Sequence, residues 1–403
     1  MKRLAKPCIL AVNGGSSSIK FAFFEGNESL KVVMRGSINR IAQPGATLRA
    51  SGLNGDDSFS RSVKIPSYRS AVDLFLSWLD ESGLCQSLLA IGHRIVQGGP
   101  NYSQPEIITA AMITDLQRMS SIDPEHLPNE ILLAQSLHQH FPGCPQVACF
   151  DTAFHHDMPQ VAKILPIPRR YEKLGIHKYG FHGLSYEFLL KDLSRIVGSE
   201  VAQGRVIFAH LGSGASLAAV KKGLPLDTSM SFTPTSGVPM STRSGDLDPG
   251  LSWYLQQVEG LDGKAFHDMV NFKSGLLGIS ETSSDMEDLL KTENQDHRAA
   301  EAIAVFCYQV KKCIGSFATV LGGLDVLVFA GGIGENSAPI RERVCAGLEF
   351  LGIEMEENQN NKNATLLSKI SSRVAVYMIH TDEEGRIAEN VYQILELNKK
   401  KET

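Results

Sequence analysis

The chain has 403 residues, of which 43% are hydrophobic, and a formal net charge of -5. This length exceeds what one hydrophobic core usually serves and predicts two domains. Charges of both signs are scattered along the chain, which argues against a surface for nucleic acid or membranes. The most apolar late stretch is interrupted by Lys311, Lys312 and Asp325, so we expect no membrane span.

The seven cysteines are odd in number and unclustered, and they include no C-x-x-C pair. They lie at positions 8, 85, 144, 149, 307, 313 and 345, mostly inside apolar stretches. This pattern favours reduced core thiols in a cytoplasmic protein over disulfide or metal-binding roles. Near the N-terminus only four apolar residues separate Cys8 from Asn13, too few for a secretory signal.

The first predicted element is a β-hairpin at residues 9–24, ILAVNGGSSSIKFAFF. β-forming residues flank a Gly/Ser centre, so the centre is expected to form a tight turn. The glycines allow a ligand to approach closely, and the backbone N–H groups, the serine hydroxyls and Lys20 supply donors. The turn therefore suits a polyanion, although an ordinary hairpin with small residues in its loop has the same pattern.

Residues 206–220, VIFAHLGSGASLAAV, repeat this plan about half a chain later. When Gly14 is laid on Gly212, Ser18 falls on Ser216. The chain therefore holds two copies of a unit made of a strand, a turn and a second strand. A further strand with a third glycine turn is predicted at 326–336, VLVFAGGIGEN. Neither hairpin turn matches a P-loop or a dinucleotide-binding fingerprint.

The rest of the chain alternates between helical and strand patterns, which predicts mixed α/β sheets with helices packed on them, twice. A polar, glycine-containing region follows the first hairpin to about residue 61. Helices are expected at 71–79, 114–119, 130–140, 182–193, 301–321, 337–350 and 384–397. Further strands are expected at 88–95, 146–150 and 374–379, with a loop at 166–170.

Six short motifs follow one another along the chain: GHRIVQGG (92–99), FDTAFH (150–155), YGFHGLS (179–185), HLGSGAS (210–216), STRSGDLDPG (241–250) and AGGIGEN (330–336). Each is unspecific alone, but in this order they resemble the acetate kinase family, within the superfamily of actin, sugar kinases and heat-shock ATPases. The resemblance implies an α/β protein with two duplicated actin-like (ribonuclease H-like) mixed-sheet domains and an inter-domain cleft. It places an N-terminal lobe with acyl-substrate contacts at 1–150, joined by a C-terminal helix at about 385–403. The nucleotide-binding lobe is expected at 151–384.

The activity implied by the resemblance is reversible phosphoryl transfer from ATP to acetate, giving acetyl phosphate and ADP. The implied catalytic residues are Asp151, His182, Arg243 and Arg94. Arg94 would also bind the acyl substrate, with Val96, Phe181 and Pro234 beside it. Arginine suits this chemistry because its planar group pairs with carboxylate and phosphoryl oxygens and keeps its charge. From the residues alone, surface ion pairs are the better interpretation of the two arginines, and a hydrogen-bonded core position that of the histidine.

In the family, Asp151 would serve as a proton donor or acceptor. A small carboxylic acid has a pKa of roughly 4, so at neutral pH it is already ionised and needs no base. We therefore expect Asp151, which follows a buried strand, to orient Arg94 or a metal-bound water.

The resemblance also implies a nucleotide site and a bound Mg²⁺, with Mn²⁺ as a possible substitute. The nucleotide-binding residues would be Lys20, His210, Leu211, Gly212, Ser213, Gly214, Asp285, Met286, Glu287, Gly331, Gly332, Ile333, Gly334 and Glu335. The metal would lie near Asn13 and Glu383, with Glu384 as an open alternative to Glu383. Without the family, Asn13 is also a turn-forming residue and 382–384 the acidic first turn of a helix.

The chain departs from the family pattern at positions near both substrates. Glu287 stands where Arg is frequent and cannot make a cation–π contact with the base, so nucleotide preference stays open. Ser213 replaces the usual Asn, and its shorter hydroxyl is still a donor. Gln97 and Glu125 replace a common His and Leu, so the choice between acetate and propionate also stays open.

Three alternatives to an acetate kinase have a basis in the sequence. The first is a propionate kinase or another short-chain acyl kinase. An ATP-driven binding clamp would need a substrate-binding appendage, and the two lobes leave no residues for one. A sugar kinase would need a polar acceptor pocket instead of Arg94 beside Val96 and Pro234. The family also implies a cytoplasmic homodimer with small-molecule substrates.

Overall fold

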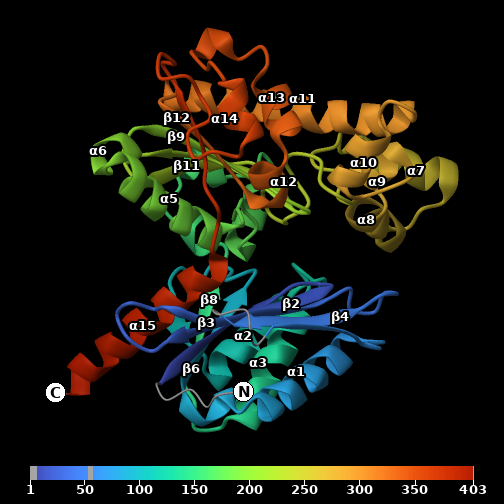
Figure 1. Ribbon diagram of the computed structural model, residues 1–403. Coiled ribbons are helices and arrows are strands. Elements are labelled where there is room, and N and C mark those ends of the chain that lie inside the picture. The colour runs from blue at the N-terminus through green and yellow to red at the C-terminus, as the bar shows by residue number, and fades with distance from the viewer. Residues whose placement is uncertain (1–6, 53–57, 403) are drawn as a thin grey trace. The chain divides into compact units, whose positions relative to one another are not determined.

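The computed structural model describes residues 7–52 and 58–402 and divides into two compact units, coloured along the chain in Figure 1. Unit 1 comprises residues 1–153 and 382–403, and unit 2 comprises residues 154–381. From the sequence, we expected the boundaries between the two lobes directly after residues 150 and 384. Asp151 and Glu383 therefore belong to unit 1 and not, as expected, to the second lobe. The reason is that the chain leaves unit 1 only after residue 153 and returns to it at residue 382.

Unit 1 contains an eight-stranded mixed sheet with the order β5-β4-β3-β2-β1-β6-β8-β7. Its strands are β1 (Cys8–Gly14), β2 (Ser18–Glu25), β3 (Val32–Asn39), β4 (Thr47–Gly52), β5 (Phe59–Ser62), β6 (Leu88–Ile95), β7 (Glu106–Ile107) and β8 (Gln146–Phe150). Strands β1, β6 and β8 are parallel neighbours, whereas β1 to β5 pair antiparallel. The hairpin predicted at 9–24 is confirmed as β1 and β2, in which Asn13 pairs with Lys20.

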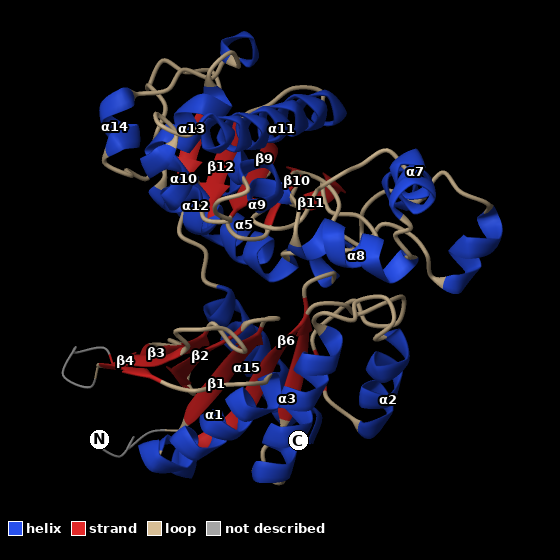
Figure 2. Ribbon diagram, turned by 90° about the vertical axis from the view of Figure 1, so that its right-hand side faces the viewer, coloured by secondary structure: helices blue, strands red, loops and turns tan. Residues whose placement is uncertain are grey.

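Helices cover both faces of this sheet, and Figure 2 shows them in blue beside the red strands. They are α1 (Tyr68–Ser82), η1 (Leu84–Ser87), α2 (Ala110–Met119), α3 (Leu127–His140) and α15 (Glu383–Glu402), with the short turn η2 (Ala153–His155) at the unit boundary. On one face Phe21 packs against Phe75 and Trp78 of α1, with ring centroids 4.8 Å apart in both pairs. On the other face α15 approaches Gly92 so closely that an added Cβ would lie 2.3 Å from Ile387. A glycine is therefore needed where α15 packs.

Unit 2 contains a five-stranded mixed sheet with the order β11-β10-β9-β12-β13. Its strands are β9 (Arg205–Leu211), β10 (Ala215–Lys221), β11 (Leu224–Thr228), β12 (Val326–Ala330) and β13 (Ala375–Met378). Strands β9, β12 and β13 are parallel, and β9, β10 and β11 are antiparallel. Strands β3-β2-β1-β6-β8 of unit 1 have the same order and directions, so the predicted duplication of a mixed α/β domain is confirmed.

The helices of unit 2 include a long buried one, α11, which ends at Gly322 in the left-handed conformation with φ 74°. They are α4 (Gln160–Lys163), η3 (Arg169–Leu174), α5 (Gly183–Val197), α6 (Ser199–Ala202), α7 (Gly250–Glu259), α8 (Gly263–Phe272), α9 (Gly275–Ser280), α10 (Met286–Thr292), α11 (His297–Leu321), α12 (Gly331–Asn336), α13 (Ala338–Cys345), η4 (Glu349–Leu351) and α14 (Glu357–Asn361). Apolar residues of α11 at helical spacing, including Ile303, Phe306 and Val310, are fully buried.

One region received no structural prediction from the sequence, and two predictions of local structure were wrong. The polar region after the first hairpin forms strands β3 to β5, whose residues Met34, Ile38 and Leu48 are buried in the core. The third glycine turn is the first turn of helix α12, because Gly331 adopts φ +75° and lets the chain turn directly from β12. The helix expected to reach residue 350 ends at Cys345.

The cysteines whose side chains are described carry free thiols, and four of them are buried. Burial raises the pKa of Cys8 and Cys307 to about 11, so these thiols stay protonated and unreactive at neutral pH. The side chain at position 85 lies outside the described residues. Within the part of the chain that is described, no helix is both long and apolar enough to cross a bilayer.

Candidate active site

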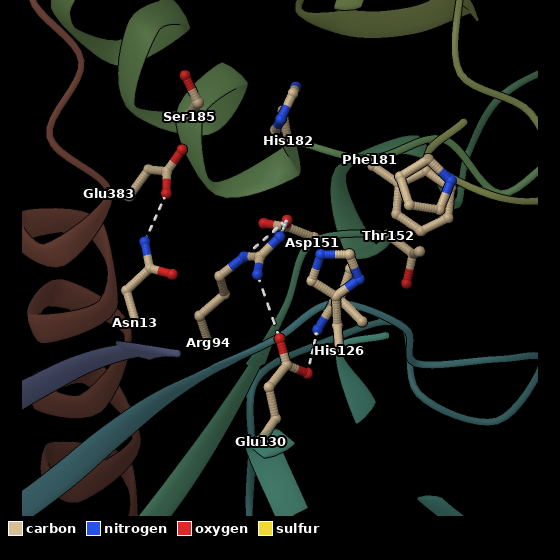
Figure 3. A network of polar contacts seen from close by, with 12 residues as sticks. Asn13, Arg94, His126, Glu130, Asp151, Thr152, Phe181, His182, Ser185 and Glu383 are labelled. Carbon is tan, nitrogen blue, oxygen red and sulfur yellow. Dashed lines mark hydrogen bonds and ion pairs between the residues drawn. The ribbon is translucent and has the colours of Figure 1, made fainter. Parts of the chain in front are cut away.

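The predicted site residues form two groups, one in each unit. In unit 1, Asn13, Arg94 and Asp151 come from the carboxyl ends of the parallel strands β1, β6 and β8. Functional residues commonly gather at this edge of a parallel sheet, where the strands end and the loops begin. Figure 3 shows these side chains together with Glu130 of α3 and Glu383, the first residue of α15.

The guanidinium of Arg94 is held by two carboxylates. Its Nε and Nη2 donate to the same oxygen of Asp151, Oδ2, at 2.9 and 2.5 Å. Its Nη1 donates to Oε1 of Glu130 at 3.2 Å and to the carbonyl oxygen of Gly14 at 3.4 Å. The nearby negative charges, led by Asp151 and then Glu130, outweigh the effect of burial and raise the pKa of Arg94. Arg94 is therefore a fixed positive charge in a buried place.

Asp151 is buried and uses one oxygen to hold Arg94. Among the described residues its other oxygen, Oδ1, has no hydrogen-bond partner. Burial raises the pKa of Asp151, although Arg94 acts in the opposite direction. The double contact with Arg94 is what the expected orienting role requires, because it fixes both the position and the plane of the guanidinium.

Glu130 was not among the residues predicted from the sequence. Its Oε2 accepts a hydrogen bond from the backbone N–H of Val96 at 2.9 Å, and its side chain is 1% exposed. A sequence signal was present, since Glu130 shares the buried face of α3 with Leu127, Ile131 and Ala134. A carboxylate at such a core position needs a partner, and that partner is Arg94.

Asn13 and Glu383 are in direct contact. Nδ2 of Asn13 donates to Oε2 of Glu383 at 2.8 Å, although the two residues are far apart in sequence. Amide and carboxylate oxygens are the ligand type that Mg²⁺ prefers, and Mg²⁺ usually keeps several waters and binds substrate phosphates. In residues 7–52 and 58–402 no cluster of three or more His, Cys, Asp or Glu side chains is arranged to hold a metal. Asn13 and Glu383 bring two side chains that carry such oxygens into contact.

Lys20 and Glu384 lie beside this pair. Lys20 is exposed on β2 and lines a shallow depression of about 810 Å³ with Arg35, Arg49 and Glu384. Burial, and next the charge of Glu383, raise the pKa of Glu384. Glu384 lies 3.6 Å from Arg35, whereas Glu383 contacts Asn13. Of these two carboxylates, Glu383 is therefore the one in contact with Asn13.

In unit 2 the predicted phosphate turn, Gly212 to Gly214, joins β9 and β10. A Cβ added to Gly214 would lie 3.4 Å from Nε2 of His182 and 3.8 Å from Nη1 of Arg243. The side chains of His182 and Arg243 therefore lie next to the turn. His182 has a positive φ of 60° just before α5, and its Nδ1 contacts the hydroxyl of Ser216 at 2.8 Å. The rings of His182 and His210 stack with centroids 4.3 Å apart.

Arg243 lies on a loop that is tied to neighbouring segments. Its Nη1 donates to the carbonyl oxygen of Pro234 at 3.1 Å, and its own carbonyl accepts from the N–H of Met240 at 3.0 Å. Gly275, with φ +61°, packs against the same loop, since an added Cβ would lie 2.6 Å from the carbonyl oxygen of Arg243. The structure thus brings Pro234 and Arg243 into contact. Phe181 is 1% exposed, and its carbonyl accepts from His155.

The start of α12 lies against the phosphate turn. A Cβ on Gly331 would lie 2.7 Å from the carbonyl oxygen of Leu211, so the close approach of the two segments requires a glycine. Glu335 anchors this segment, because its Oε1 accepts from the N–H groups of Gly331 and Thr381 at 3.0 and 3.1 Å. Its other oxygen contacts His380 at 2.7 Å. Glu335 thus has a structural role that the sequence did not indicate.

The residues expected beside adenosine lie at the start of α10. Asp285 is its N-cap and accepts from the N–H groups of Glu287 and Asp288. Glu287 is exposed and forms an ion pair with Lys291 at 2.6 Å. Met286 is buried. Each of the three residues thus has a local structural role in the described structure.

A mixed sheet built twice in one strand order, each copy with a glycine-containing hairpin, defines an α/β protein of the actin-like ATPase fold. The sequence matches the Acetokinase family over residues 8–389, and the chain belongs to this family.

The chain is 42% identical to the acetate kinase of Nitrobacter hamburgensis over 392 residues, which cover 96% of each chain. It is similar to the crystal structure of Porphyromonas gingivalis acetate kinase, with a TM-score of 0.85 and 36% identity, covering 96% of this chain and 100% of that one. The crystal structure of a propionate kinase from Francisella tularensis gives a TM-score of 0.88 and 33% identity, covering 95% and 98%.

Proposed function

We propose that this protein is an acetate kinase, which transfers the γ-phosphoryl group of ATP to acetate and gives acetyl phosphate and ADP reversibly. The observation that carries the proposal is Arg94, a buried guanidinium oriented by Asp151 in a chain of the acetokinase family. Two anions must meet in this reaction, so a fixed positive charge is needed for each of them. Arg94 supplies one and Arg243 the other.

In this proposal Arg94 binds the carboxylate of the acyl substrate, and Val96, Phe181 and Pro234 line its apolar end. Arg243 and His182 stabilise the phosphoryl group during transfer, beside the turn from Gly212 to Gly214. Support for these roles comes from the short distances between Gly214, His182 and Arg243. The transferring group carries charge on its oxygens, which oriented N–H donors stabilise more in the transition state than in the ground state.

The nucleotide would contact Lys20, His210 to Gly214, Asp285 to Glu287 and Gly331 to Glu335. Asn13 and Glu383 would hold Mg²⁺, or Mn²⁺ in its place, and the contact between them supports this pair. When bound, the metal supplies positive charge to the β- and γ-phosphate oxygens. The exposed Glu287 gives no cation for the base, so ATP and GTP should both be tested.

A propionate kinase is the second candidate function, because one similar structure is a propionate kinase. A hydrophobic pocket separates chains that differ by one methylene by only about 1–3 kcal/mol. The test is formation of acyl phosphate, trapped as the hydroxamate, with acetate, propionate and butyrate in turn. Each acid is tested with ATP, GTP and pyrophosphate. The highest kcat/KM is expected with acetate and ATP, and no acyl phosphate from any combination would reject a kinase.

Replacement of Asp151 by Asn tests whether this residue orients Arg94 or moves a proton. We expect a loss of activity, because Asn accepts the hydrogen bonds of Arg94 more weakly than a carboxylate does. The pH profile of the residual kcat/KM should keep its shape, since an ionised acyl substrate needs no base. Initial rates from about pH 6 to about pH 9 check this. Loss of a titrating limb in the variant would assign Asp151 to proton transfer instead.

We also infer a homodimer that uses the face of α7 in unit 2. Trp253, Tyr254 and Val258 on this helix are 66%, 60% and 60% exposed, and large apolar side chains gathered in this way mark an interaction site. Replacement of Trp253 by Glu is expected to shift the sedimentation coefficient from that of a dimer to that of a monomer. Replacement of the exposed Ile196 on α5 by Glu is the matched control and should leave it unchanged. A monomeric unmodified protein would contradict the inference.

The buried free thiols support a cytoplasmic location.

A further inference from the structure

Glu130 is a buried carboxylate beside the proposed acyl-binding arginine. It is 2% exposed, and both of its oxygens are engaged, Oε1 by Arg94 and Oε2 by the N–H of Val96. Glu130 thus contacts Arg94 and Val96, the two residues of unit 1 that bind the acyl substrate in our proposal. Neither residue needs Glu130 for its own position, because Asp151 already orients Arg94 and Val96 follows directly on strand β6.

The charges around Arg94 disfavour a carboxylate ligand when both acids are ionised. One guanidinium then faces two carboxylates, and Glu383 also acts electrostatically on both Arg94 and Asp151. A carboxylate substrate would add one more negative charge to the buried cluster of Arg94, Asp151 and Glu130, whose net charge is already negative. Repulsion of this kind is large in a buried place, where little water screens it. Either the substrate binds weakly or one acid becomes neutral.

We propose that Glu130 acts through Arg94: in alkaline solution, where Glu130 is ionised, it takes up one proton from solvent when the acyl carboxylate binds at Arg94, so that carboxylate binding is coupled to protonation. This inference rests on the proposed function. A neutral Glu130 keeps one oxygen as an acceptor for the N–H of Val96 and gains an O–H donor. Protonation of Glu130 removes one negative charge next to Arg94. The positive charge of Arg94 is then available to bind the carboxylate of the substrate.

The surroundings of Glu130 allow it to change its protonation state. The charged or titratable groups that face it are Arg94 on β6, Asp151 after β8, Asp123 and His126 at the start of α3, and Tyr68 on α1. Burial raises the pKa of Glu130 to about 8 against the lowering effect of Arg94. An added anionic carboxylate raises this pKa further, because it also disfavours the ionised form.

The test is the dependence of the acetate KM on pH. Below about pH 7 Glu130 is already neutral and KM should be constant, whereas above about pH 8 KM should rise towards about tenfold per pH unit, the limit for one proton. The KM for ATP should not follow this slope. The Glu130→Gln variant mimics the neutral acid, so its acetate KM should stay flat up to about pH 9.5 and remain near the neutral-pH value of the unmodified protein.

A matched control is Glu106→Gln, because Glu106 is exposed on β7 of the same unit. This variant should keep the rise of KM with pH. If Glu130→Gln also keeps the rise, or the unmodified enzyme shows a flat KM, the inference is wrong. An enzyme that makes no acyl phosphate from any acid fails as a kinase, which is a separate result.

A second measurement needs no variant. Sodium acetate is added to the unmodified protein at about pH 9 in weak buffer with an indicator dye, and proton uptake approaching one per chain is expected at saturation. Chloride at the same concentration is the control and should cause no uptake. Binding of acetate without proton uptake would overturn the inference, even if Glu130→Gln failed to fold.

Discussion

Replacement of Arg243 by Ala is expected to lower kcat by on the order of 10³-fold, because a cation that stabilises a transferring phosphoryl group contributes at least this much. The structure supports a specific role for this side chain. It lies beside Gly214 of the phosphate turn and is tied to the carbonyl of Pro234, so its position does not depend on the substrate. The acetate KM should change little, since Arg94 binds the acyl substrate in our proposal.

The measurement is hydroxamate formation at saturating ATP and acetate, together with a thermal unfolding curve to show that the variant folds. Arg195→Ala is the matched control, because Arg195 is exposed on α5 of the same unit and forms an exposed ion pair with Asp192 at 3.0 Å. The control should retain kcat within about twofold. A kcat of Arg243→Ala within tenfold of the unmodified enzyme would exclude Arg243 from phosphoryl stabilisation.

Replacement of Arg94 by Ala is expected to damage both stability and activity. Asp151 and Glu130 would lose the cation that pairs with them in a buried place, and breaking a buried pair in this way costs about 3–5 kcal/mol. The enzyme would also lose the donor for the acyl carboxylate, so the acetate KM should rise by on the order of 10²-fold.

Thermal and urea unfolding at neutral pH measure the first effect, and steady-state kinetics the second. The loss of stability should shrink as the pH falls towards about 5, because protonation then neutralises the carboxyl group of Asp151, whose pKa is raised by burial, whereas Glu130 is already neutral below about pH 7. Arg118→Ala is the control, since Arg118 is exposed and its pair with Asp115 at 3.4 Å is worth only about 0–1 kcal/mol. Equal stability losses in both variants would contradict a buried ion-pair cluster at Arg94.

The central architecture was predictable because its signals are local. Apolar runs that flank Asn13-Gly14 and Leu211-Gly212 indicate hairpins, and the buried strands β6, β8 and β12 match the predicted residues. Strands β3 to β5 were missed because their residues alternate between core and surface, and their polar members hid the period. The conformation of Gly331 was missed as well, since a glycine pair fits a turn and a helix start equally well.

For the site, the identity of the residues was easier to predict than their partners. Arg94 was named from its motif, but its ion pair with Glu130 joins residues 36 positions apart on a strand and a helix. The same holds for Asn13 and Glu383, which are separated by 370 positions. Motifs record which side chains occur together along the chain, whereas these contacts depend on how the sheet and its helices pack.

The split construction of unit 1 has a consequence during translation. Helix α15, which begins at Glu383, packs on β6 at Gly92, yet the ribosome makes all of unit 2 before it reaches this helix. A nascent chain interrupted before residue 382 therefore contains all of unit 2. The sheet of unit 1 in this chain is not yet covered by α15 and lacks Glu383, the carboxylate that contacts Asn13. In our proposal the metal site includes Glu383, so we expect that such an unfinished chain does not hydrolyse ATP.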